Sequence, residues 1–124
     1  MSAFESPSIR LAFYANEAVE KYDGVEIDTD GKFAKATQAN PFIGVCQYGA
    51  EAANNMITVV KGIFPAKAAE EITAGDDISV GTTAGTFIVA VTTEGSETDV
   101  IGKALTGAAA PANDVYETFT LLIY

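Results

Sequence analysis

The stretch IDTDGKFA (residues 27–34) decides how the fold is read. Asp28 and Asp30 lie two positions apart and Gly31 follows, a spacing that resembles the start of a calcium-binding loop. The same residues fit a tight turn between two strands, because Asp-Gly flanked by alternating apolar residues is a strong hairpin signal. If Gly31 took the sixth position of an EF-hand loop, Thr37 would stand at the twelfth, where a bidentate glutamate is required. The sequence therefore favours a β-hairpin.

Apolar residues alternate with polar ones on both sides of this hairpin. In IRLAFYA (9–15), Ile9, Leu11 and Phe13 share one face, and MITVV (56–60) alternates in the same way. Turn pairs such as Asp-Gly and Asn-Pro separate these runs, so many short strands are expected. We predict an all-β fold, a small barrel or sandwich with little helix. Residues 65–71 (PAKAAEE) are either a short helix or a crossover, and residues 50–55 (AEAANN) a loop or a single turn.

The chain also repeats its own pattern. VEKYDGVEI (19–27) aligns with ITAGDDISV (72–80), and IGVCQYGAEAANN (43–55) with IGKALTGAAAPAN (101–113). MITVVKGIF (56–64) then aligns with YETFTLLIY (116–124). We therefore predict two similar halves, residues 16–64 and 70–124, within a single β domain spanning 16–124. Residues 1–15 would form an N-terminal arm and a first strand.

The composition of the 124 residues narrows the classes of function. The net charge of −10 and only 7 basic residues argue against nucleic-acid binding, which depends on Lys and Arg at the phosphates. The absence of histidine removes the commonest general base and transition-metal ligand. Cys46 is the only cysteine and lies in an apolar run, which favours a buried free thiol. We expect no catalytic site, no metal, no cofactor, no secretory signal and no membrane segment.

One long run carries a resemblance to a known family. KGIFPAKAAEEITAGDDISV (61–80), with IGV at 43–45 and IGKAL at 101–105, resembles the small capsid decoration, or capsid cement, proteins of tailed bacteriophages. The shared pattern is a Gly-aromatic strand end, a Pro-x-Lys corner and an ITAGD turn into the next strand. VEKYDGVEIDTDGK looks like the family's first hairpin, except that Tyr22 stands where glycine is usual. The resemblance covers residues 16–124.

The resemblance implies a β-rich protein that is made in the host cytoplasm and sits on the outer surface of the phage head. Its partners would be the major capsid protein and further copies of itself, as a homotrimer. Its function would be to bridge capsid subunits and stabilise their lattice, without chemistry. An acidic surface suits a virion exterior that must not adhere to DNA.

Six apolar residues are candidates for a capsid or subunit interface. Phe4 belongs to residues 1–8, which are either a frayed terminus or an arm that docks on a neighbour. The strand at 87–91 is apolar on both faces, which indicates either burial on both sides or a subunit contact, and the second face of the last strand carries the same ambiguity. The candidates are Phe4, Ile9, Phe87, Val89, Leu122 and Tyr124.

Two other classes of function stay open. A β-rich fibre or adhesin domain that binds a host-surface glycan is the main alternative, although the chain has no tryptophan and its tyrosines are dispersed in sequence. A carboxylate-based hydrolase is the other. The adjacent pairs Asp76-Asp77 and Glu70-Glu71 are poorly placed for it, because neighbouring side chains in an extended strand point to opposite faces.

Overall fold

The computed structural model describes residues 6–124, which form nine β-strands in one antiparallel sheet. The described residues contain no α-helix, and therefore none long and apolar enough to cross a membrane. The all-β prediction is confirmed. The strands are β1 (Ser6–Tyr14), β2 (Gly24–Ile27), β3 (Phe33–Lys35), β4 (Phe42–Tyr48), β5 (Met56–Lys67), β6 (Asp77–Val80), β7 (Phe87–Val89), β8 (Gly102–Ala104) and β9 (Thr118–Ile123).

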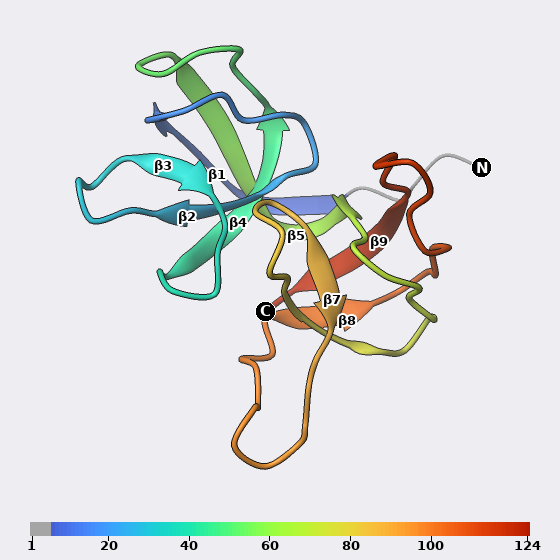
Figure 1. Ribbon diagram of the computed structural model, residues 1–124. Helices are drawn as coiled ribbons and strands as arrows, with labels where there is room; N and C mark the ends of the chain where they lie inside the picture. The colour runs from blue at the N-terminus through green and yellow to red at the C-terminus, as the bar shows by residue number, and fades with distance from the viewer. Residues whose placement is uncertain (1–5) are drawn as a thin grey trace.

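The strand order is symmetric about its middle. It runs β3-β2-β4-β5-β9-β8-β6-β7, and β1 pairs with β5 off this path. β5 is the longest strand and takes part in both halves: residues 56–63 pair with β1, and residues 63–67 pair with β9. Figure 1 shows β1 to β4 on one side of β5, and β7 to β9 on the other. We call β1 to β4 with residues 56–60 of β5 the N-terminal unit, and residues 63–67 of β5 with β6 to β9 the C-terminal unit.

The opening stretch forms the predicted hairpin. β2 pairs with β3 in antiparallel register, with Ile27 opposite Phe33. Gly31 has a φ of 77°, a left-handed conformation that glycine adopts without strain. The carboxylate of Asp28 accepts hydrogen bonds from the backbone N–H groups of Asp30 and Lys32, at 2.9 and 3.0 Å. Asp28 therefore caps the turn.

Equivalent contacts recur in the two units. An isolated parallel bridge joins Ala15 to Phe33 in the N-terminal unit, and another joins Ala68 to Phe87 in the C-terminal unit. The antiparallel bridge Val19–Ala50 has a counterpart in Ile72–Ala108, which agrees with the sequence alignment. We interpret the units as two copies of one motif, each a small sheet that curls until its first strand reaches its hairpin.

The pairing places the boundaries of the motif differently from the sequence alignment. Cys46 lies opposite Val59, and its counterpart Ala104 lies opposite Leu121, so Val59 corresponds to Leu121 and not to Phe119. β1 corresponds to residues 63–67 of β5, so the first copy begins with β1 and not after it. Residues 65–67 lie in β5, with Pro65 buried opposite Thr120. The short helix considered for residues 65–71 does not form, because this segment supplies the first strand of the second unit.

Glycine lets the strands of each unit approach closely. Gly44 and Gly102 occupy equivalent places in β4 and β8, after Ile43 and Ile101. A Cβ atom on Gly44 would lie 2.5 Å from the carbonyl oxygen of Val60, and one on Gly102 would collide with the carbonyl oxygen of Leu122. These collisions explain why both Ile-Gly pairs stand where the next strand crosses.

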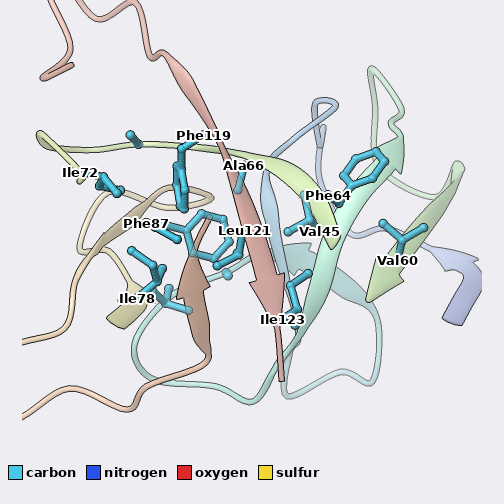
Figure 2. Packing of buried hydrophobic residues seen from close by; sticks show 14 residues of the cluster. Val45, Val60, Phe64, Ala66, Ile72, Ile78, Phe87, Phe119, Leu121 and Ile123 are labelled. Atoms are coloured by element: carbon cyan, nitrogen blue, oxygen red, sulfur yellow. The ribbon is translucent and has the colours of Figure 1, made fainter. Parts of the chain in front are cut away.

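The main core spans both units. The C-terminal unit contributes Phe87, Phe119 and Leu121, and the N-terminal unit adds Val45 and Val60 to the same cluster, as Figure 2 shows. A smaller cluster fills the N-terminal unit alone, around Ala15, Val19, Val25, Phe33, Cys46, Ile57 and Val59. Because one apolar cluster crosses between the units, they form a single body.

The contact between the units, which we call the seam, also contains a buried ion pair. The Lys67 ammonium, at the end of β5, lies 2.8 Å from the Asp23 carboxylate and 3.1 Å from that of Glu20. Asp23 is buried, whereas Glu20 is exposed. The Tyr22 ring packs against Phe64 of β5 at 5.8 Å between centroids. The loop at residues 20–24 of the N-terminal unit thus covers the first strand of the C-terminal unit.

Contacts in the seam also shift the pKa values of Lys67 and Glu20. Burial disfavours the charged form of Lys67, but hydrogen bonds from its ammonium to Asp23 and Glu20 outweigh burial and raise the pKa of Lys67. The hydrogen bond and positive charge of Lys67 lower the pKa of Glu20. Stability from Glu20 is lost as pH falls through its lowered pKa, and stability from Lys67 is lost as pH rises through its raised pKa.

Replacing Lys67 tests the seam. We expect Lys67→Met to lower the free energy of unfolding by about 3 kcal/mol, because Asp23 would stay buried without its cation. The loss should be fully present between the ordinary pKa values of 4.5 for Glu20 and 10.5 for Lys67, and should shrink beyond them. Urea unfolding of both proteins across that pH range measures it.

The matched control is Lys103→Met, which removes the exposed pair between Lys103 and Asp77. Because both partners are in water, we expect a loss below about 1 kcal/mol. Equal losses in the two variants would show that the Lys67 pair does not hold the seam.

Candidate interaction surface

The predicted interface residues fall into three groups in the structure. Phe87 is fully buried, Val89 and Leu122 are partly buried, and Ile9 and Tyr124 are exposed. Phe4 lies outside the described residues. The exposed and partly buried members are not one patch, because Val89 packs against the main core opposite Ile78.

The prediction that Phe87 is an interface residue needs correction, because its side chain is fully buried. Its ring makes edge-to-face contacts with Phe42 at 5.7 Å and Phe119 at 6.3 Å, between centroids. Phe42 comes from the N-terminal unit, so this side of β7 is covered by the chain itself. The apolar pattern of residues 86–91 on this face reflects burial between units and not a free surface.

Two of the candidates lie beside the middle of β5. Ile9 is opposite Lys61, and Leu122 is opposite Ile63. Tyr124 follows β9, and its backbone N–H donates to the carbonyl oxygen of Ile101 at 3.0 Å. The structure thus brings Ile9 and Leu122 to opposite edges of β5, beside residues 61 and 63, although they lie at opposite ends of the sequence.

β1 carries the most exposed apolar surface of the described chain. Ile9, Leu11 and Phe13 on one face and Tyr14 on the other are all exposed. The register places Tyr14 opposite Met56, and Tyr48 of β4 opposite Thr58, so Tyr14, Met56 and Tyr48 share a face of the sheet. We call the whole set the β1 surface: Ile9, Leu11, Phe13, Tyr14, Tyr48 and Met56.

The two faces of the β1 surface join around the edge of the strand. The rings of Phe13 and Tyr14 lie 5.8 Å apart between centroids, although neighbouring side chains of a strand start on opposite faces. Among the described strands β1 pairs only with β5, so its other edge is open between residues 9 and 13. An open edge presents backbone N–H and C=O groups to which a further strand can bind.

The β1 surface contrasts with the rest of the molecule in charge. None of its six residues is charged, whereas the chain as a whole carries a net charge of −10. Arg10, the one charged side chain of β1, donates from Nε to Oε1 of Gln47 at 3.1 Å. Sequence reasoning identified the alternation of residues 9–13 but not the surface, because Tyr48 and Met56 join it only through strand pairing.

The reactive and titratable groups inside the fold have structural roles. Cys46 is buried, as predicted, and burial together with the nearby Asp23 carboxylate raises the pKa of its thiol to about 12. The buried Glu26 carboxylate accepts hydrogen bonds from Thr37 N–H, Thr37 Oγ1 and Asn40 Nδ2, at 2.7, 2.6 and 2.7 Å. Cys46 is thus held as a neutral thiol, and Glu26 anchors a loop.

A family model described as phage cement protein matches residues 5–119, most of the chain. The chain belongs to the phage cement protein family. It is therefore a non-enzymatic structural protein of the phage capsid, as the resemblance in its sequence implied. The match covers β1 and residues 16–119 of the region in which the resemblance was found.

A comparison with solved structures finds the same fold in the N-terminal base of the head fibre protein gp8.5 of bacteriophage phi29. The TM-score is 0.67 at 17% sequence identity, over 94% of this chain and 93% of the other. At this identity the match establishes the fold alone. No curated protein sequence matches the chain.

Alanine substitutions at Phe87 and Tyr124 test which of these two residues belongs to the core. We expect Phe87→Ala to lower the free energy of unfolding by about 3–5 kcal/mol, because it empties the core between the units. Tyr124→Ala, at an exposed position, should change it by less than about 0.5 kcal/mol. Chemical denaturation measures both. A Phe87→Ala protein as stable as the parent would return Phe87 to the list of interface residues.

Proposed function

We propose that this cement protein binds the outer surface of a tailed-phage head as a homotrimer and bridges neighbouring major capsid proteins. The observation that carries the proposal is the β1 surface, an uncharged, aromatic and methionine-containing patch on an otherwise acidic protein. Family membership supports the capsid as the partner. The fold shared with the base of a phage head fibre supports a location on the head.

The composition of the β1 surface suits a protein partner. Tyrosine and methionine are enriched at the buried centre of protein interfaces, and charged residues are depleted there. Tyr48 and Met56 are 63% and 54% exposed, so most of each side chain is free to be buried by a partner. Complete burial of such a side chain contributes about 1.5–3 kcal/mol.

Cementing requires differential binding and no chemistry. A protein that binds the expanded lattice better than free or unexpanded subunits stabilises the lattice by mass action. Three linked copies raise the effective concentration of each contact, so a modest affinity per copy is sufficient. The acidic remainder of the surface repels DNA and other virions, which leaves the uncharged patch as the adhesive part.

Capsid binding by this surface is tested with Tyr48→Ser/Met56→Ser. Each change removes most of an exposed apolar side chain, so we expect affinity for heads to fall about 10–100-fold. The rise in capsid melting temperature that the parent protein produces should fall with it. Occupancy on heads that lack the protein, measured by sedimentation and gel densitometry, gives the affinity.

The control is Val115→Ser, which removes an exposed apolar side chain from a loop between β8 and β9. It should bind heads like the parent. Full occupancy by the Tyr48→Ser/Met56→Ser protein, with its fold intact, would contradict capsid binding through Tyr48 and Met56 of the β1 surface.

The homotrimer is tested separately, by light scattering or native mass spectrometry of the purified protein over a range of concentrations. We expect a trimer to accumulate as concentration rises. A monomer up to about 1 mM, the effective concentration that short tethers provide, would contradict a preformed trimer.

A glycan-binding fibre or adhesin domain is the second candidate. Two observations favour it: Tyr14 and Tyr48 share one face of the sheet, and a cleft of about 380 Å³ with both polar and apolar lining residues lies between the units. The cleft is lined in part by Asn40, Glu97 and Asp99. Binding of the isolated protein to host cells, lost in Asp99→Ala, would support this function, and capsid stabilisation would not depend on it.

A further inference from the structure

The first strand of the C-terminal unit is covered at the seam, whereas the corresponding strand of the N-terminal unit, β1, is exposed. In the C-terminal unit, the face of the first strand carries Phe64 and Ala66, both fully buried in the core that the two units share. The corresponding residues of β1 are Leu11 and Phe13, because Leu11 lies opposite Val59 as Phe64 lies opposite Leu121. Leu11 and Phe13 remain 48% and 44% exposed. No described segment covers the N-terminal unit as that unit covers its neighbour.

The hairpins show the same asymmetry. Val80 in β6 is 7% exposed, whereas its counterpart Ile27 in β2 is 40% exposed. A Cβ atom on Gly85 would lie 3.0 Å from the Asp23 carboxylate across the seam, whereas nothing lies within 4 Å of one on its counterpart Gly31. The hairpin of the C-terminal unit is therefore packed against the N-terminal unit, whereas the equivalent hairpin positions of the N-terminal unit are exposed.

The loop of the N-terminal unit that covers the C-terminal unit also has an exposed counterpart in the C-terminal unit. The loop at residues 20–24 forms the seam, and its counterpart is the loop at residues 73–77, which is mostly exposed. The two loops fold alike: Asp23 accepts a hydrogen bond from Glu20 N–H at 2.8 Å, and Asp76 accepts one from Thr73 N–H at 2.9 Å. Beside the second loop, Leu122 and the exposed Val100 correspond to Val60 and Phe42.

We propose that the β1 face of one copy, carrying Leu11, Phe13 and Ile27, receives the C-terminal unit of a second copy through its loop at residues 73–77. The contact repeats the seam between molecules. Asp76 of one copy lies beside Tyr14 of the next, in the relation that Asp23 has to Lys67 within the chain. The contact joins two different surfaces, so it makes closed rings or open chains and not symmetric pairs.

The intermolecular contact is weaker than the seam for identifiable reasons. Lys103 stands in the place of Val45 and Gly75 in the place of Tyr22, so less apolar surface is buried. Asp77 replaces Gly24, whose position has no room for a Cβ atom beside Phe87, so the two copies must sit slightly further apart there. β5 also crosses the seam unbroken, whereas at the copy-to-copy contact the end of β9 and the start of β1 come from separate chains. Both strand ends correspond to residues 59–62 of β5, so they must diverge from each other there. Such a contact forms at the high local concentration on a capsid.

Directed cross-linking of the free protein tests this contact without involving the capsid. Tyr14→Cys and Asp76→Cys are purified separately, mixed at about 1 mM and oxidised mildly. We expect a covalent dimer that contains one of each variant, in at least tenfold excess over the dimers that either variant forms alone. Cys46 stays unmodified because it is buried and its thiol pKa is raised to about 12. Mass spectrometry of the joined peptides identifies the bond.

A gain-of-function variant provides the second measurement. Tyr14→Lys places an ammonium where Lys67 stands in the seam, so we expect self-association to strengthen about tenfold and to return to the parent level in Tyr14→Lys/Asp76→Ala. Sedimentation equilibrium measures both proteins. Failure of the mixed cross-link, or a Tyr14→Lys effect that persists without Asp76, would overturn the head-to-tail contact. Neither result would bear on capsid binding through Tyr48 and Met56.

Discussion

The structure depends on β5, a single strand that belongs to two units. Its first half completes the sheet of the N-terminal unit, and its second half begins the sheet of the C-terminal unit. Neither unit has a complete sheet without it. Lys67 at its end is held by carboxylates of the other unit, and Phe64 lies under Tyr22. The shared strand therefore holds the two units together as one body.

The same arrangement determines which surface stays open. In a tandem of two copies, one copy covers the first strand of the other, and none of the residues that the structure describes covers the first strand of the leading copy. This strand is β1, whose apolar residues would be buried if a third unit preceded it. An exposed apolar strand is an association liability in a free monomer. In this cement protein, we propose that the exposed strand is the means of attachment.

The comparison with the phi29 head-fibre base shows how little sequence the fold requires. At 17% identity the two chains share their architecture over nearly their whole length. In this chain the fold depends on alternating apolar residues, on turns that accept left-handed residues, and on glycines such as Gly44 and Gly102 where strands cross. Many sequences can meet these requirements, because they concern side-chain size and backbone conformation and not particular functional groups.

The sequence by itself determined the local features: the β class, the Asp-Gly hairpin, the buried Cys46, the acidic character and the two-fold pattern of motifs. Each follows from residues close together along the chain, where period and turn chemistry act directly. Only the tertiary structure decided that residues 65–67 are strand and not helix, because β9 pairs with them, and that Phe87 is core, because Phe42 of the other unit covers it. The β1 surface likewise exists only through strand register, which places Tyr48 and Met56 beside Tyr14. Burial and exposure of an apolar strand depend on what packs against it, and residues distant in sequence supply that partner.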